Sequence, residues 1–138
     1  MSFDRHLMIL CAQAVRYLRR HTYQVRRKIK IADGQAAVAA VRAGDASLLA
    51  TAVRYLLEEL GNRAPGNTVE VRVPPFGAIQ CIEGPRHTRG TPPNVIEMTP
   101  EVWFALAVGE LDWQTALDSG RVHASGTRAE IKDQLPLL

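Results

Sequence analysis

The chain has 138 residues, of which 46% are hydrophobic and 22% charged, and its formal net charge is +3. This size and composition exclude a disordered chain and are sufficient for one domain that folds without a metal or disulfide. The sequence contains no apolar run near the roughly 20 residues of a membrane span, and the apolar residues 7–11 are fewer than the roughly seven that a secretion signal needs. We therefore expect a cytoplasmic protein whose two cysteines, Cys11 and Cys81, stay reduced.

The N-terminal half has a helical hydrophobic pattern. Apolar residues recur at three- and four-residue steps over 3–18, which predicts a first helix. A short alanine-rich helix is predicted over 35–41. Asp45 is a suitable N-cap for a further helix, whose apolar stripe covers 48–60 and which we expect to end at Gly61.

The hydrophobic period then changes to two, which indicates strands. Valine occupies every second position over 69–73 and predicts a half-buried strand. A Pro-Pro-Phe-Gly turn over 74–77 leads to a second strand over 78–82, so the two strands form a predicted hairpin. Residues 83–93 are rich in glycine and proline and predict an irregular loop, after which a third strand covers 94–98.

The C-terminal part contains two more predicted helices, over 99–109 and 112–120, because each stretch begins with an N-cap residue and ends with a glycine. A fourth strand is predicted over 121–124. The Thr-Arg-Ala-Glu sequence at 127–130 has the form of a capping box and predicts a last helix that Pro136 ends. This order of elements predicts an α+β fold with a mainly antiparallel sheet.

The positive charge is concentrated at the N-terminus. Residues 1–34 carry eight lysines and arginines against two acidic residues, whereas the rest of the chain carries nine basic and twelve acidic residues. We interpret 1–34 as a basic, helical N-terminal extension and 35–138 as the folded domain. Such an extension indicates either contact with nucleic acid or an anionic membrane surface, or simply the solvated face of an ordinary helix. We favour the solvated face, because the rest of the chain has no basic patch interleaved with aromatic residues.

Sequence motifs of enzymes are scarce. The chain has no Walker loop, no dinucleotide-binding glycine motif and no zinc-protease motif, and its four histidines are dispersed. Cys81 falls inside a predicted strand, where a cysteine is more often a small core residue than a nucleophile. We therefore expect no catalytic activity, no metal and no cofactor.

The loop after the predicted hairpin is the most polar candidate site. Arg86, His87 and Arg89 on a turn shaped by glycine and proline could hold a carboxylate or a phosphate. The alternative is that the two arginines pair with acidic side chains such as Glu83 and Glu97 and only fix the loop. The spacing of these residues does not separate the two interpretations.

Two stretches resemble a known family. The run from Trp103 through Trp113 to Gly126 resembles the C-terminal signature of the sterol carrier protein superfamily, and residues 73–94 are similar to a bacterial, largely actinobacterial, branch of it. The likeness covers about residues 35–135. It implies a sterol-carrier-like fold, with a five-stranded sheet that is covered by helices and encloses an apolar tunnel. It also implies binding or transfer of fatty acids, acyl thioesters or sterols.

Our leading hypothesis is therefore a non-enzymatic carrier of a small apolar ligand. Strand alternation and the family likeness together predict the residues that line its cavity: Val71, Ile79, Cys81, Trp103, Leu106 and Trp113. We expect three further residues near its entrance: Arg86, His87 and Arg89. Both tryptophans could equally be ordinary core residues. The alternative is an interaction or nucleic-acid-binding module that acts through the basic N-terminal segment. A third hypothesis is a thiol-dependent isomerase module, because a related domain accompanies such enzymes, but this sequence lacks their metal-binding partner domain.

Nucleic acid is the less favoured partner. We expect no transmembrane segment, although transient contact with a membrane surface is compatible with the basic extension. The sequence does not indicate an oligomeric state.

Overall fold

Four strands form one mixed sheet within residues 25–85 and 94–138, which are the residues described by this computed structural model. The strands are β1 (Val69–Val73), β2 (Gly77–Cys81), β3 (Val95–Met98) and β4 (Val122–Ser125), and their order in the sheet is β2-β1-β3-β4. β1 and β3 are parallel, whereas β2 and β4 pair antiparallel with their neighbours. The prediction of an α+β fold is confirmed, and two of the three strand pairs in the described sheet are antiparallel. Five strands are not found, since the described part of the chain holds four.

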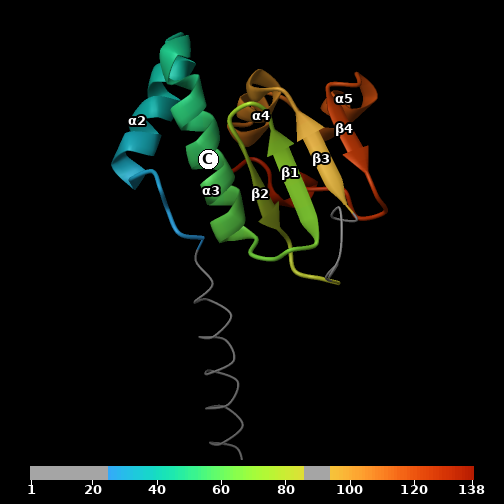
Figure 1. Cartoon of the computed structure of the whole chain (residues 1–138). Helices are drawn as coiled ribbons and strands as arrows, with labels where there is room; N and C mark the ends of the chain where they lie inside the picture. The colour runs from blue at the N-terminus through green and yellow to red at the C-terminus, as the bar shows by residue number, and fades with distance from the viewer. Residues whose placement is uncertain (1–24, 86–93) are drawn as a thin grey trace, which may run out of the picture.

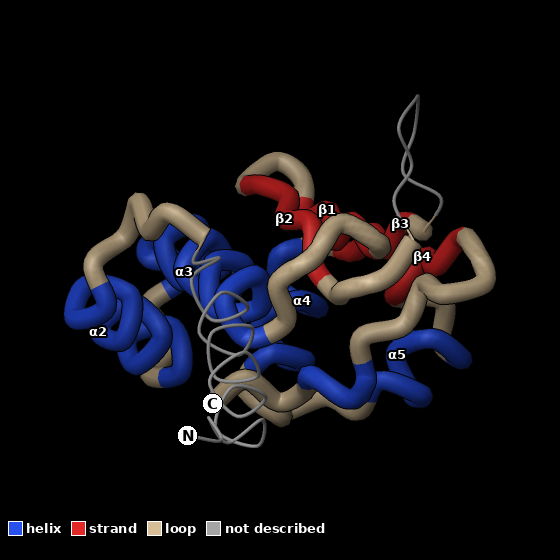
Figure 2. The backbone as a smooth tube through the Cα atoms, turned by 90° about the horizontal axis from the view of Figure 1, so that it is seen from below, coloured by secondary structure: helices blue, strands red, loops and turns tan. Residues whose placement is uncertain are grey.

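The helices cover one face of this sheet. They are α2 (Ile31–Arg42), α3 (Leu49–Arg63), α4 (Pro100–Ala107) and α5 (Trp113–Asp118), with 3-10 turns at Ala46–Leu48 and Lys132–Gln134. Figures 1 and 2 show α3 beside β2 and α2 on the outer side of α3. Figure 2 shows α4 and α5 on one side of the remaining strands. Within the described residues, no helix is both long and apolar enough to cross a membrane.

Two predicted caps set the starts of α4 and α5, whereas Asp45 caps the 3-10 turn Ala46–Leu48 instead of α3, which begins at Leu49. The Thr99 hydroxyl accepts a hydrogen bond from the Val102 N–H at 3.4 Å, and Pro100 occupies the first helical position. The Asp112 carboxylate accepts from the Thr115 N–H at 3.1 Å at the start of α5. Each cap satisfies a backbone donor that has no partner inside its own helix. These starts depend on contacts between near neighbours in the sequence, and the predictions for them are confirmed.

Two predicted helix boundaries are wrong. The alanine-rich helix begins at Ile31 rather than at residue 35. α3 continues through Gly61 to Arg63, because this glycine serves close packing instead of helix termination. A Cβ at Gly61 would lie 2.8 Å from Cγ2 of Val25 and 2.9 Å from Cγ1 of Ile79.

The predicted last helix is also wrong. Residues 127–136 form only the short turn Lys132–Gln134. Ile131 and Leu137 are both buried, and residues six positions apart do not share a helix face. The backbone of this segment bonds to distant partners instead: the Arg128 N–H donates to the Asn94 side chain at 2.9 Å, and the Leu137 N–H donates to the Ala107 carbonyl at 2.8 Å.

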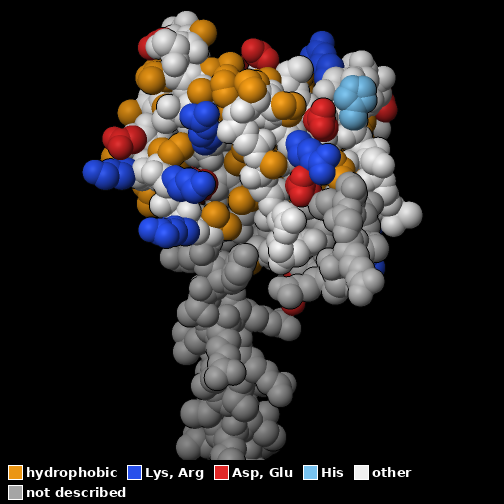
Figure 3. Space-filling model, in the orientation of Figure 1, with side chains coloured by type: hydrophobic (Ala, Val, Ile, Leu, Met, Phe, Trp, Pro, Cys, Tyr) orange, Lys and Arg blue, Asp and Glu red, His pale blue; other side chains and the backbone are white. Residues whose placement is uncertain are grey.

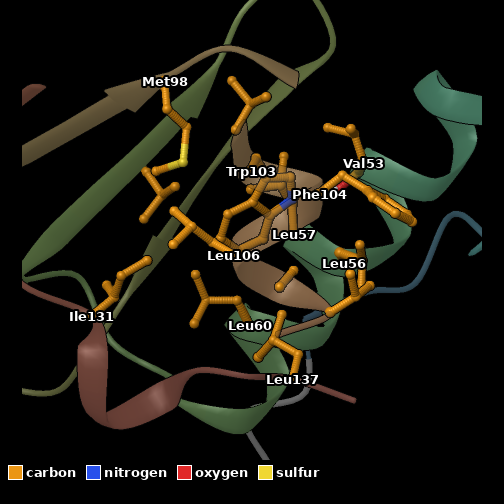
Figure 4. Packing of buried hydrophobic residues seen from close by; sticks show 14 of the residues in the cluster. Val53, Leu56, Leu57, Leu60, Met98, Trp103, Phe104, Leu106, Ile131 and Leu137 are labelled. Carbon is orange, nitrogen blue, oxygen red and sulfur yellow. Dashed lines mark hydrogen bonds between the residues drawn. The ribbon is translucent and has the colours of Figure 1, made fainter. Parts of the chain in front are cut away.

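The core lies between the sheet and the helices. Figure 4 shows side chains of α3, α4 and the C-terminal segment around the same interior, and the inward-facing valines of β1 are fully buried as well.

The predicted helix over 3–18 lies outside the described residues. The division of the chain at residue 34 stays a prediction.

Candidate ligand-binding groove

A groove of about 480 Å³ lies where the sheet and helix layers meet at the β2 edge. It is lined by residues of the segment 25–29, of α3 and of the hairpin: Val25, Arg26, Lys28, Ile29, Arg54, Leu57, Glu58, Phe76, Gly77, Ala78 and Ile79. This volume is within the range of small-molecule sites, about 300–1,000 Å³.

The floor of the groove is apolar because of the register of the hairpin. Gly77 and Ile79 pair with Val73 and Val71, whose side chains are fully buried, so all four positions face the helix layer. Gly77 has no side chain and leaves open space: a Cβ there would meet only Cδ1 of Leu57, at 3.5 Å. The groove therefore leads from solvent to the edge of the hydrophobic core.

One wall of the groove is the segment 25–30, which is held by side chains of α3. The Asn62 side-chain oxygen accepts the Val25 N–H at 2.7 Å. The two carboxylate oxygens of Glu58 accept the N–H groups of Lys28 at 3.0 Å and of Ile29 at 3.4 Å, and Glu58 is only 8% exposed. These bonds hold the segment in place, although it belongs to no strand or helix.

Three cations surround the groove and form its rim: Arg26, Lys28 and Arg54, all exposed. Arg54 donates from Nε to the Phe76 carbonyl at 3.0 Å, and its guanidinium carbon lies 5.7 Å from the centroid of that ring. Figure 3 shows basic side chains among hydrophobic ones over the part of the molecule that contains α3. In the sequence, Arg26 and Lys28 are only part of a basic extension, and no local signal predicts their place beside an apolar floor.

The sequence-predicted site residues fall into three groups. Ile79 lines the groove. The residues that belong to the buried core are Val71, Cys81, Trp103, Leu106 and Trp113. The three predicted entrance residues Arg86, His87 and Arg89 lie outside the described residues, so the two interpretations of their loop stay predictions.

Cys81 has the properties of an inert thiol. Its side chain is fully buried, and this burial raises the pKa of the thiol to about 12. An unperturbed cysteine has a pKa of about 8.5, and the thiolate is the reactive form. The thiolate fraction of Cys81 is therefore very small at pH 8.

We expect Cys81 to react with Ellman's reagent far more slowly in the folded than in the unfolded protein. The measurement uses a Cys11→Ser variant at pH 8, with and without denaturant, because Cys81 is then the only cysteine in the chain. Rapid labelling of the folded variant would show that the thiol is accessible and ionised, which contradicts the packing described above.

A second groove, of about 520 Å³, follows the opposite edge of the sheet. It is lined by Val95, Glu97, Leu117, Val122, His123, Ala124 and Ser125. Glu97 and His123 are partners across the β3–β4 pair. The groove beside β2 is the better match for an apolar ligand, because Leu57, Phe76 and Ile79 give it an apolar floor and its cations stand at the rim.

Comparison with known proteins places these elements in a family. The model of the family described as bacterial SCP ortholog matches residues 45–137. The chain belongs to this family of bacterial sterol carrier proteins. A search of curated proteins gave no match. The resemblance seen in the sequence is thus confirmed, and family membership associates the chain with apolar ligands in general.

The sterol carrier match covers only part of the groove. α3, the hairpin and the other two strands lie inside residues 45–137, so the floor of the groove and Arg54 belong to the matched part. The wall formed by 25–30 lies before it. Two of the three rim cations therefore come from a segment that the family model does not match.

Proposed function

We propose that this sterol carrier family member is a non-enzymatic carrier that binds a fatty acid, an acyl thioester or a sterol in the groove beside β2. The observation that carries the proposal is the apolar floor formed by Leu57, Phe76 and Ile79, which opens to solvent next to the core. An apolar chain that covers this floor gains about 25 cal/mol for each Å² removed from water.

The chemistry of the lining supports binding rather than catalysis. Leu57, Phe76 and Ile79 have no group that transfers a proton or attacks a substrate. The carboxylate of Glu58 also lines the groove, but both of its oxygens accept backbone N–H groups of the wall. The wider cavity lining predicted from the sequence, with Val71, Cys81, Trp103, Leu106 and Trp113, stays part of the proposal.

Filling the groove is expected to abolish ligand binding. A Gly77→Phe substitution places a ring over Leu57, and we expect the affinity for the fluorescent fatty acid cis-parinaric acid to fall at least about tenfold, or about 1.4 kcal/mol. The same titration with the fluorescent sterol dehydroergosterol tests the sterol class. Gly77→Val serves as a smaller substitution if the phenylalanine variant unfolds.

The matched control is Ala124→Phe, which places the same ring at an exposed strand position in the second groove. We expect this variant to bind like the wild type. Binding that survives in folded Gly77→Phe but is lost in Ala124→Phe would move the site to the β4 edge. No saturable binding of either probe to the wild type would refute the carrier function.

A further inference from the structure

The segment 25–30 presents its side chains in alternation. Val25, Arg27 and Ile29 are half-buried, whereas Arg26, Lys28 and Lys30 are exposed. Arg27 is the inward-facing cation and forms an ion pair with Glu59 of α3. The docked backbone therefore presents a row of three outward cations, of which the first two line the groove and the third does not.

The acidic side chains of α3 offset the positive charge of this rim only in part. Glu59 pairs with Arg27, and among the described residues Glu58 is the one acidic residue that lines the groove. Both oxygens of Glu58 are engaged by backbone N–H groups, and this carboxylate is buried behind the wall. Within the described residues, Arg26, Lys28 and Arg54 take part in no ion pair. Three exposed cations thus surround an apolar floor.

We propose that this rim selects amphiphiles with an anionic head over neutral apolar molecules, with Arg26 and Lys28 as the specificity-determining residues. This inference rests on the proposed function, because it concerns the same groove. The tail covers Leu57, Phe76 and Ile79, while the carboxylate or phosphate stays at the solvent boundary beside the cations. Charge pairing at this boundary avoids the desolvation cost of burying an ionised head group.

The geometry makes the selection separable from folding. The bonds that hold the wall use the backbone N–H groups of Val25, Lys28 and Ile29, so changing the exposed side chains leaves those bonds in place. Arg54 also holds the hairpin turn through the Phe76 carbonyl and is left unchanged in the test. Lys30 provides a control with the same exposure in the same segment.

The test compares three probes with the same ten-carbon chain: decanoate, decyl phosphate and 1-decanol. Their dissociation constants are measured by NMR titration of the Ile29 and Ala78 amide signals in the wild type, in Arg26→Gln/Lys28→Gln and in Lys30→Gln. We expect the double substitution to weaken both anionic probes about 2–30-fold, as the loss of two exposed charge pairs predicts, and to leave decanol binding unchanged. Raising the salt concentration to about 1 M, where the screening length is about 3 Å, should weaken anion binding in the same way.

The outcomes separate this inference from the proposed function. Equal affinity of the wild type for decanoate and decanol refutes the selection and leaves the carrier function standing. The selection is also refuted if Lys30→Gln loses as much affinity for the anionic probes as the double variant does. It is refuted as well if the double variant loses affinity for decanol and for the anions to the same extent. No binding of any probe refutes the carrier function itself. If the double variant loses affinity only for decyl phosphate, the rim selects phosphate head groups. If it loses affinity equally for both anions, the rim selects anionic head groups in general.

Discussion

Replacing Trp103 with alanine is expected to lower the free energy of unfolding by about 3–5 kcal/mol. The indole is fully buried between the sheet and α3, and its Nε1–H donates to the Val53 carbonyl at 3.3 Å. The substitution therefore leaves a large cavity and removes a buried hydrogen bond at the same time. Equilibrium denaturation in urea measures the effect. A loss below about 1 kcal/mol would contradict the placement of Trp103 at the centre of the core.

Trp113 provides the matched comparison for the hydrogen bond alone. This second tryptophan is also buried, but its Nε1 has no hydrogen-bond partner among the described residues. Tryptophan-to-phenylalanine substitutions remove the same atoms at both positions. We expect Trp103→Phe to cost at least about 1 kcal/mol more than Trp113→Phe, because it removes a hydrogen bond whereas Trp113→Phe removes a buried donor that has no partner among the described residues. Equal losses would show that the bond to Val53 contributes nothing.

Gly34→Ala is expected to destabilise the protein by about 1–3 kcal/mol, although glycine-to-alanine changes in helices usually stabilise by about 1 kcal/mol. A Cβ at Gly34 of α2 would lie 2.1 Å from Cδ2 and 2.3 Å from Cγ of Tyr55. The tyrosine is only 2% exposed, so its ring has little room to move away. Thermal and urea denaturation give the sign and size of the change.

The control for Gly34→Ala is the reverse substitution on the exposed face of the same helix. Ala36 is exposed, so Ala36→Gly should show the helix propensity alone and cost about 1 kcal/mol. Stabilisation by Gly34→Ala would mean that α2 does not pack closely on Tyr55.

The sequence predicted the features that depend on near neighbours. The hairpin of β1 and β2 follows from alternating valines and a proline-glycine turn, and the caps at Thr99 and Asp112 each bond within their own first turn. Such interactions involve residues a few positions apart, so their pattern is visible in the sequence.

Three of the failures depend on contacts between distant residues. The capping-box pattern at 127–130 does not start a helix, and the Asn94 side-chain oxygen accepts the Arg128 N–H instead. Gly61 looks like a helix terminator but accommodates Val25 and Ile79. The candidate groove was missed for the same reason, because its wall is fixed by Glu58 and by another side chain of α3. Only Ile79 could be named from strand alternation, and no local signal joins it to Arg26.

NMR contacts between a bound ligand and the protein methyl groups show whether the ligand occupies the groove beside β2. With decanoate bound to protein labelled at its isoleucine, leucine and valine methyls, we expect nuclear Overhauser effects from the chain to Ile29, Leu57 and Ile79, which line this groove. Effects to Leu117 and Val122, which line the groove along β4, would place the ligand there and contradict binding beside β2.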